Sequence, residues 1–118
     1  MQVGIDIVEI KRFNLNNINQ FCEKYLTKNE QYYLNNKSNK AQTLAGIYAC
    51  KEAVLKAFKI GIGNGVKLTD IEIFHENSVP KINLNSIVKT LMNNINATKI
   101  DVSISHSNTL ATAICVVL

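Results

Sequence analysis

A periodic apolar segment in the middle of the chain constrains the fold more than any other feature. Between about Lys40 and Lys59, apolar residues recur at three- and four-residue intervals. They are Leu44, Ile47, Tyr48, Val54, Leu55 and Phe58. This spacing places the side chains on one face of an α-helix, so the segment predicts a long amphipathic helix. Gly61, Gly63 and Gly65 follow the segment and would end the helix.

The remaining segments predict short strands and helices on either side of this helix. Strands are expected at 3–10, 68–74, 81–84, 100–105 and 110–118, and helices at 86–95 and within 13–39. Thr27, followed three residues later by Glu30, has the pattern of a helix capping box. The order of elements predicts one α+β domain spanning 1–118, in which an antiparallel sheet packs against the long amphipathic helix.

The charge composition favours an anionic partner. The formal net charge is +4 and the sequence pI is about 9.0. The basic residues are all lysines except Arg12. Proteins that recognise nucleic-acid bases usually use the forked guanidinium group of arginine, so this composition suits binding of phosphates better than binding of base edges. We therefore expect no nucleic-acid partner, although the lysine excess leaves open a non-catalytic RNA-binding module.

The cysteines and the hydropathy pattern indicate the compartment. The three cysteines, Cys22, Cys50 and Cys115, include no Cys-x-x-Cys pair, which argues against a disulfide framework and a zinc site. No leader is evident at the start of the sequence, and no apolar run approaches the ~18 residues of a membrane span. We expect a cytoplasmic protein with no membrane partner.

Three charged residues stand in apolar surroundings. Asp6 lies between Ile5 and Ile7 in a predicted strand, where a buried carboxylate would need a cation or donors. Its position alone favours a solvent-facing side chain. Glu52 has the spacing of a surface ion pair with the lysine four residues later, yet it borders the apolar stripe. Lys51 falls near the middle of the stripe, where it must reach solvent or meet a partner.

Two further motifs have both structural and functional interpretations. The glycine series follows a helix and does not precede one, so it is not a phosphate-binding Walker loop. It is a helix stop, or a place where backbone approaches a ligand. Ser103–Ser107 contains a Ser–His pair but no nucleophile elbow. Taken by itself, His106 is therefore expected to have a structural role. His75 has no companion at metal-ligand spacing and is expected on the surface.

Taken together, three blocks of the sequence resemble a known family. They are Gly-Ile-Asp-Ile-Val-Glu-Ile at 4–10, Ala-Cys-Lys-Glu-Ala-Val-Leu-Lys-Ala-Phe at 49–58 and Val-Ser-Ile-Ser-His-Ser at 102–107. Their content, order and spacing resemble the holo-acyl-carrier-protein synthases, the small single-domain group of the 4′-phosphopantetheinyl transferases. The resemblance covers essentially the whole chain. It implies the 4′-phosphopantetheinyl transferase fold and a Mg²⁺-dependent enzyme of fatty acid biosynthesis. Such an enzyme moves 4′-phosphopantetheine from coenzyme A to a serine of acyl carrier protein and releases adenosine 3′,5′-bisphosphate.

The resemblance also assigns roles to individual residues. Asp6 and Glu52 match the Mg²⁺ ligands, and Glu52 is also the expected base for the carrier serine. Lys56 matches a catalytic lysine that contacts the coenzyme phosphates. The loop residues that match the nucleotide side of the site are Gly61, Gly63, His106 and Ser107. Arg12 matches a basic residue that meets the acidic acyl carrier protein. Homotrimers with sites at subunit interfaces are typical of the family.

Several positions depart from the family pattern. Ile47 and Tyr48 replace an Arg-Trp pair, Lys59 and Ile60 replace a Gly-Thr pair, and Asp101 replaces a histidine. These differences concern the expected coenzyme and carrier contacts, and they leave open a relative that binds coenzyme A without transferring anything. They do not touch the carboxylate pair or Lys56.

Overall fold

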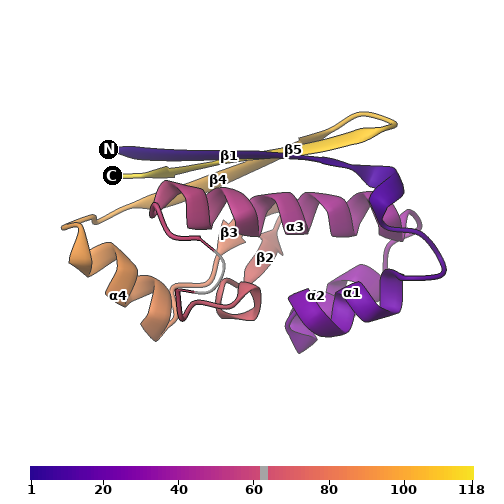
Figure 1. Cartoon of the computed structure of the whole chain (residues 1–118), viewed down its shortest axis with the longest axis horizontal. Helices are drawn as coiled ribbons and strands as arrows, with labels where there is room; N and C mark the ends of the chain where they lie inside the picture. The colour runs from indigo at the N-terminus through magenta and orange to yellow at the C-terminus, as the bar shows by residue number, and fades with distance from the viewer. Residues whose placement is uncertain (62–63) are drawn as a thin grey trace.

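The computed structural model describes residues 1–61 and 64–118 and has the predicted α+β fold (Figure 1). Its strands are β1 (Gln2–Glu9), β2 (Ile73–Glu76), β3 (Val79–Ile82), β4 (Ile100–His106) and β5 (Leu110–Val117). Its α-helices are α1 (Ile18–Tyr25), α2 (Lys28–Asn35), α3 (Lys40–Ala57) and α4 (Ser86–Asn94). Two 3₁₀ turns, Ile10–Arg12 and Leu68–Asp70, complete the described elements. Among these residues, none of the helices is both long and apolar enough to cross a bilayer.

Three strands form the main sheet, in the antiparallel order β1–β5–β4. In this register Asp6 lies opposite Ala113, which in turn lies opposite Ile104. One face of the sheet packs against α3, and Figure 1 shows no helix on the other face. The sheet therefore forms an outer layer whose far side remains open in the single chain.

The contact between β1 and α3 depends on Gly4. A Cβ atom at this position would overlap the carbonyl oxygen of Ala53 and would lie 2.5 Å from the backbone nitrogen of Ala57. The glycine, facing two alanines, lets the strand and the helix approach more closely than larger side chains would allow. This close approach brings the rest of β1 onto the same helix.

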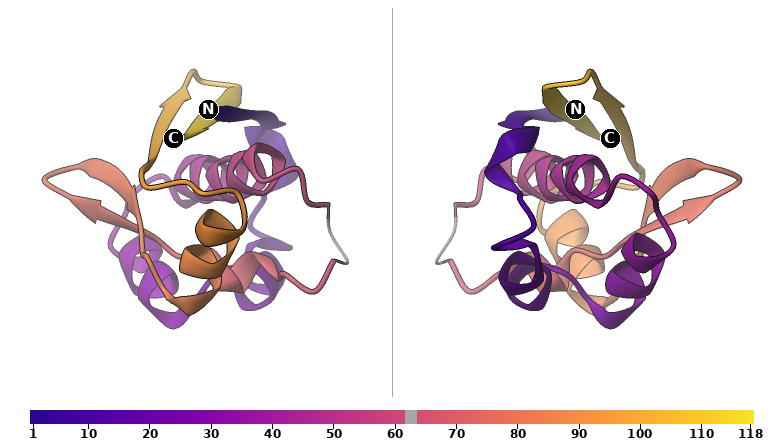
Figure 2. Two further views of the ribbon diagram at one scale, coloured as in Figure 1. Left: turned by 90° about the vertical axis from the view of Figure 1, so that its left-hand side faces the viewer. Right: turned by 90° about the vertical axis from the view of Figure 1, so that its right-hand side faces the viewer.

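Helix α3 is buried on most of its circumference, and this differs from the predicted single apolar stripe. Ala49, Ala53 and Ala57 lie fully buried in the core, and Leu44 and Lys51 are also fully buried. Figure 2 shows the reason: α3 runs through the middle of the molecule, with the sheet on one side and α1, α2 and α4 on the other. A helix covered from both sides needs apolar residues almost all round.

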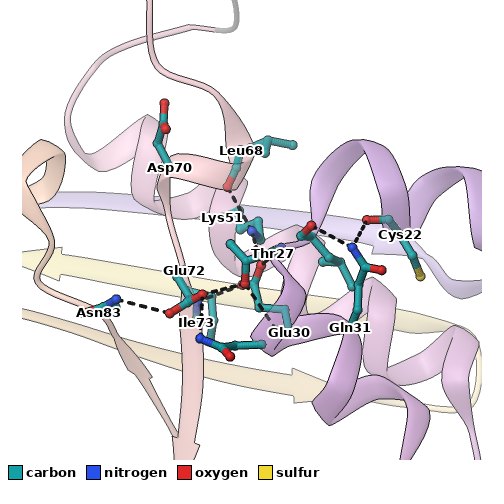
Figure 3. A network of polar contacts seen from close by, with 12 residues as sticks. Cys22, Thr27, Glu30, Gln31, Lys51, Leu68, Asp70, Glu72, Ile73 and Asn83 are labelled. Carbon is teal, nitrogen blue, oxygen red and sulfur yellow. Dashed lines mark hydrogen bonds and ion pairs between the residues drawn. The ribbon is translucent and has the colours of Figure 1, made fainter.

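A buried ion pair joins α3 to the layer opposite the sheet (Figure 3). Lys51 Nζ donates to Glu30 Oε1 at 2.6 Å and to the carbonyl of Leu68 at 2.9 Å. The other oxygen of Glu30 accepts from the backbone nitrogen of Ile73 at 2.8 Å. Both charged side chains are fully buried. The partner that Lys51 requires is therefore Glu30 of α2, and the network ties together α2, α3, β2 and the 3₁₀ turn before it.

The local predictions are partly confirmed. Thr27 and Glu30 form the capping box at the start of α2, and the hairpin and the helix at 86–95 are present as β2–β3 and α4. The strand predicted at 68–74 is wrong in its first part, because Leu68–Asp70 form a 3₁₀ turn and β2 begins at Ile73. The Leu68 carbonyl that an extended strand would offer to a neighbour is bonded to Lys51 instead.

We predict that Gly4→Ala destabilises the protein by about 3 kcal/mol, at the upper end of the usual cost of overpacking. The added methyl group meets helix backbone, which cannot move aside as a side chain can. Gly61→Ala is the matched control, since its Cβ would meet nothing within 4 Å. Urea unfolding of the two variants and wild type measures the difference. Equal stability of both variants would contradict the close contact.

We predict that Lys51→Met lowers the free energy of unfolding by about 3–5 kcal/mol, because it leaves the Glu30 carboxylate buried without its cation. Lys89→Met removes an exposed lysine from α4 and should change the stability by less than about 0.5 kcal/mol. Chemical denaturation followed by circular dichroism gives both values. A Lys51→Met protein as stable as wild type would show that the pair contributes nothing.

Candidate active site

Asp6 points from β1 toward α3 and not toward solvent. Gly4, Asp6 and Val8 share the inner face of the strand, whereas Ile5 and Ile7 are exposed on the outer face. The Asp6 side chain is only 15% exposed, and its Oδ1 accepts a hydrogen bond from Lys56 Nζ at 2.9 Å. The interpretation of Asp6 as solvent-facing is therefore wrong. The apolar residues on both sides of it gave no way to choose the face.

Glu52 lies at the border of the core on the flank of α3 that faces Asp6. Its Oε1 is buried and has no hydrogen-bond partner among the described residues. Burial raises the pKa of the Glu52 carboxyl, and the negative charge of Asp6 raises it further. Tyr48, Lys56 and Arg12 act in the opposite direction. The two carboxylates are thus close enough to repel each other.

Lys56 pairs with Asp6, fifty positions away in the sequence, and not with Glu52 four positions before it. Its side chain remains 54% exposed. The hydrogen bond to Asp6 raises the pKa of Lys56, so the side chain is a cation at neutral pH. The surface ion pair suggested by the helix spacing is accordingly absent from the described residues. What the structure brings together is a triad of Asp6, Glu52 and Lys56.

The donor set of this triad fits a hard divalent cation. Two carboxylates converge, and one oxygen is buried without a partner, an arrangement that a cation would relieve. No cluster of three or more His, Cys, Asp or Glu side chains occurs in the described part of the chain. Mg²⁺ does not need one, since it is commonly held by one or two carboxylates together with water and substrate phosphates.

Arg12 lies beside the triad, over a group of aromatic rings. Its guanidinium carbon is 4.9 Å from the ring centroid of Tyr48 and 5.8 Å from those of Phe13 and Phe21. The side chain is nevertheless exposed at the surface. Sequence reasoning did not connect these aromatic residues with the site. Their scatter over the chain, from Phe13 to Tyr48, gave no periodic signal.

The His106–Ser107 loop lies on the other flank of α3. His106 ends β4, which is the strand farthest from β1 in the sheet, with β5 between them. In a single chain the loop and the triad are therefore separated by the width of the sheet, about 10 Å at the usual strand spacing. The Ser107 hydroxyl is used locally, because it accepts from the backbone nitrogens of Thr109 and Leu110.

The remaining predicted site residues lie after α3. Gly61 is exposed and has open space around it. Gly63 lies outside the described residues. Among the described residues, nothing lies within 4 Å of the position that a Cβ atom of Gly61 would take, and no contact ties Gly61 to the triad.

A polar hollow of about 190 Å³ is lined in part by His106. It is lined by residues of α3, β4 and the β2–β3 hairpin, including Gln42, Ile47 and His75. His75 is partly buried and stacks flat on Tyr33, with ring centroids 4.1 Å apart. The expectation of a surface histidine was therefore incomplete, since stacking across two elements leaves no trace in sequence spacing.

Comparison with known proteins identifies the family. A model of the 4′-phosphopantetheinyl transferase superfamily matches residues 2–115. The holo-[acyl-carrier-protein] synthase of Caldicellulosiruptor saccharolyticus is 42% identical over 113 residues, which cover 94% of this chain and 90% of that protein. The corresponding protein of Finegoldia magna is 35% identical over 120 residues, covering 100% and 96%.

Solved structures agree with these relatives. Holo-[acyl-carrier-protein] synthase of Helicobacter pylori, in complex with coenzyme A, superposes with a TM-score of 0.82 at 32% identity, covering 98% of this chain and 99% of that one. The synthase of Bacillus anthracis in complex with coenzyme A (3′,5′-ADP) gives a TM-score of 0.79 at 31% identity, covering 98% and 94%. The sequence match and the shared fold thus both extend over nearly the whole chain, which therefore belongs to the 4′-phosphopantetheinyl transferase superfamily, as the three sequence blocks predicted.

Proposed function

We propose that this protein is a holo-[acyl-carrier-protein] synthase that transfers 4′-phosphopantetheine from coenzyme A to a serine of apo-acyl carrier protein. The reaction requires Mg²⁺, releases adenosine 3′,5′-bisphosphate and serves fatty acid biosynthesis in the cytoplasm. The observation that carries the proposal is the convergence of Asp6 and Glu52 around an unpartnered buried oxygen, next to Lys56. Relatives named for this activity, and related structures holding coenzyme A, support it.

Asp6 and Glu52 are the residues that would hold Mg²⁺. The ion would neutralise the two carboxylates and stabilise negative charge on the pyrophosphate of coenzyme A during transfer. Lys56 currently neutralises Asp6, but more than half of its side chain is exposed. It would be free to turn toward the coenzyme phosphates if a metal took its place at Asp6.

Glu52 is suited to receive the proton of the carrier serine. Burial and the charge of Asp6 raise the pKa of its carboxyl, and a higher pKa strengthens a carboxylate as a proton acceptor. The serine oxygen attacks the β-phosphorus of coenzyme A as its proton passes to Glu52. The bond from that phosphorus to the adenosine 3′,5′-bisphosphate breaks, and its electrons leave with the nucleotide.

The separation of the His106–Ser107 loop from the triad supports a homotrimer with sites at subunit interfaces. If catalysis needs both the triad and the His106–Ser107 loop, the triad of one chain is completed by the loop of a neighbouring chain. The open face of the sheet carries the exposed apolar residues Val3, Ile5 and Ile7 of β1 and Ile114 of β5. Contiguous apolar surface of this kind is typical of a protein–protein contact.

The carrier protein is expected to meet the site near Arg12. This guanidinium is exposed and lies next to the triad, and the net charge of +4 favours an acidic partner through long-range attraction. A module that binds coenzyme A or RNA without transferring anything is the alternative. The next experiment distinguishes the two.

We predict that Asp6→Asn and Glu52→Gln each lower the rate of transfer by about a hundredfold or more, because each removes a charge that holds the metal. Mass spectrometry of apo-acyl carrier protein incubated with coenzyme A, Mg²⁺ and enzyme detects the gain of one phosphopantetheine group. Glu9→Gln removes an exposed carboxylate from the same strand and should leave the rate unchanged.

Chelation provides the matching test of the metal. EDTA should abolish transfer, and excess Mg²⁺ should restore it. Transfer that persists in EDTA would contradict the metal role of the carboxylates. Coenzyme A binding without any mass gain on the carrier would favour a module that only binds coenzyme A. RNA binding without a metal requirement would favour an RNA-binding module.

We predict that two inactive variants complement each other. In mixed oligomers of Glu52→Gln and His106→Ala, obtained by co-expression, some interfaces combine a wild-type Glu52 with a wild-type His106 of the neighbouring subunit. Transfer should therefore exceed the summed activity of the separate variants several-fold. Activity equal to that sum, in oligomers shown to be mixed by mass, would contradict a site shared between subunits.

A further inference from the structure

Four aromatic side chains next to Glu52 form a closed ring. Phe13 packs edge-on against Phe21 at 4.8 Å between centroids, and Phe21 stacks on Tyr25 at 5.5 Å. Tyr25 meets Tyr48 at 5.3 Å, and Tyr48 returns to Phe13 at 5.6 Å. Aromatic pairs at these distances hold each other in defined orientations. Tyr48, which is 7% exposed, is thereby held between two of these rings, Phe13 and Tyr25.

Tyr48 stands one helical turn before Glu52 on α3, and their side chains are neighbours on the same flank of the helix. Tyr48 opposes the rise in the pKa of the Glu52 carboxyl, although the described structure shows no formed hydrogen bond between the two side chains. Oε1 of Glu52 has no partner in the described structure. The contact therefore has room to tighten, as hydrogen bonds in active sites do when ligands bind.

Arg12 lies where it can orient the Tyr48 hydroxyl. Its guanidinium carbon is 4.9 Å from the Tyr48 ring centroid, and Arg12 opposes the rise in the pKa of the Tyr48 hydroxyl that burial causes. Guanidinium can only donate and an ionised carboxylate can only accept. A hydroxyl between them must accept from Arg12 and donate to Glu52. Such a chain also polarises the hydroxyl and strengthens its donation.

We propose that Tyr48 is a positioning residue for Glu52: its hydroxyl, oriented by Arg12 and by the aromatic ring, donates to the Glu52 carboxylate and holds it toward Asp6. The proposal rests on the proposed function of the triad. It assigns to the hydroxyl a role in the geometry of the metal pair that packing alone does not require.

The other donors near Glu52 cannot supply this constraint. Lys56 is engaged with Asp6 and is largely exposed, and Arg12 reaches Glu52 only as a neighbouring charge. Both cations are attached through long, flexible side chains. Of the described neighbours of Glu52, Tyr48 alone combines a rigid side chain with a fixed position on the helix that carries Glu52. Loss of its hydroxyl should therefore loosen the carboxylate without disturbing the fold.

Tyr48→Phe tests the proposal, because it removes only the hydroxyl and keeps the six-membered ring of the side chain. Binding of Mn²⁺, in the presence of adenosine 3′,5′-bisphosphate, is followed by electron paramagnetic resonance of the free ion. We expect Tyr48→Phe to bind Mn²⁺ about tenfold more weakly than wild type, the usual effect of losing a residue that orients a metal ligand. The Mg²⁺ concentration that gives half-maximal transfer should rise by a similar factor.

Tyr25→Phe is the matched control. It removes the other tyrosine hydroxyl of the same aromatic ring, and Tyr25 does not contribute to the environment of Glu52. This variant should bind Mn²⁺ as wild type does. Thermal unfolding of both variants shows whether the aromatic ring remains intact; a fall in melting temperature of Tyr48→Phe alone would mean that the hydroxyl serves the fold, and would overturn the proposal.

The outcomes separate this inference from the proposed function. If wild type transfers phosphopantetheine and binds Mn²⁺, and Tyr48→Phe equals Tyr25→Phe in metal binding, Tyr48 is not a positioning residue, while the function stands. If wild type neither transfers phosphopantetheine nor binds Mn²⁺, the proposed function is wrong, and the inference that rests on it is wrong as well. A tenfold weakening confined to Tyr48→Phe supports both.

Discussion

The arrangement of the molecule depends on the buried ion pair between Lys51 and Glu30. Burying a charged pair costs several kcal/mol per ion, and attraction repays this only when the geometry is good and the remaining polar atoms are bonded. Both conditions are met, since Lys51 also donates to the Leu68 carbonyl and Glu30 also accepts from Ile73. A shift or rotation of α3 would break several of these bonds at once. The pair therefore fixes the helix between the sheet and the helical layer (Figure 3).

The position of the candidate site follows from this constraint. Successive residues of an α-helix point about 100° apart, so anchoring Lys51 on the side away from the sheet turns Glu52 to the flank beside β1. Gly4 then determines how near β1 can come. Asp6, two residues further along the same face of the strand, consequently meets Lys56 and faces Glu52. The carboxylates are held together by a helix register that is set on the opposite side of α3.

Local sequence patterns predicted the elements but not their faces. Periodicity located α3, and the Thr27–Glu30 spacing located the start of α2, because both signals arise within a few residues. The sequence did not predict which face of β1 carries Asp6, since apolar residues occupy both alternating sets of positions in this strand and either face could be the buried one. Contact with α3 makes the choice, and that contact requires Gly4. The partners of Lys51 and Lys56, at Glu30 and Asp6, lie 21 and 50 positions away, beyond any pattern of spacing.

The charges around the triad would allow the proposed site to take a cation and an anionic coenzyme together. Asp6 and Glu52 are balanced by Lys56 and Arg12, so the free site has little net charge and attracts neither ligand strongly alone. Because the lysine of the Asp6–Lys56 pair is 54% exposed, solvent screens the pair and its exchange costs little. In the proposed enzyme, a divalent ion at the carboxylates would release Lys56 and leave an excess of positive charge, which phosphates could then neutralise. In the proposed enzyme, metal and coenzyme would therefore strengthen each other's binding, with Tyr48 keeping Glu52 in place while Lys56 moves.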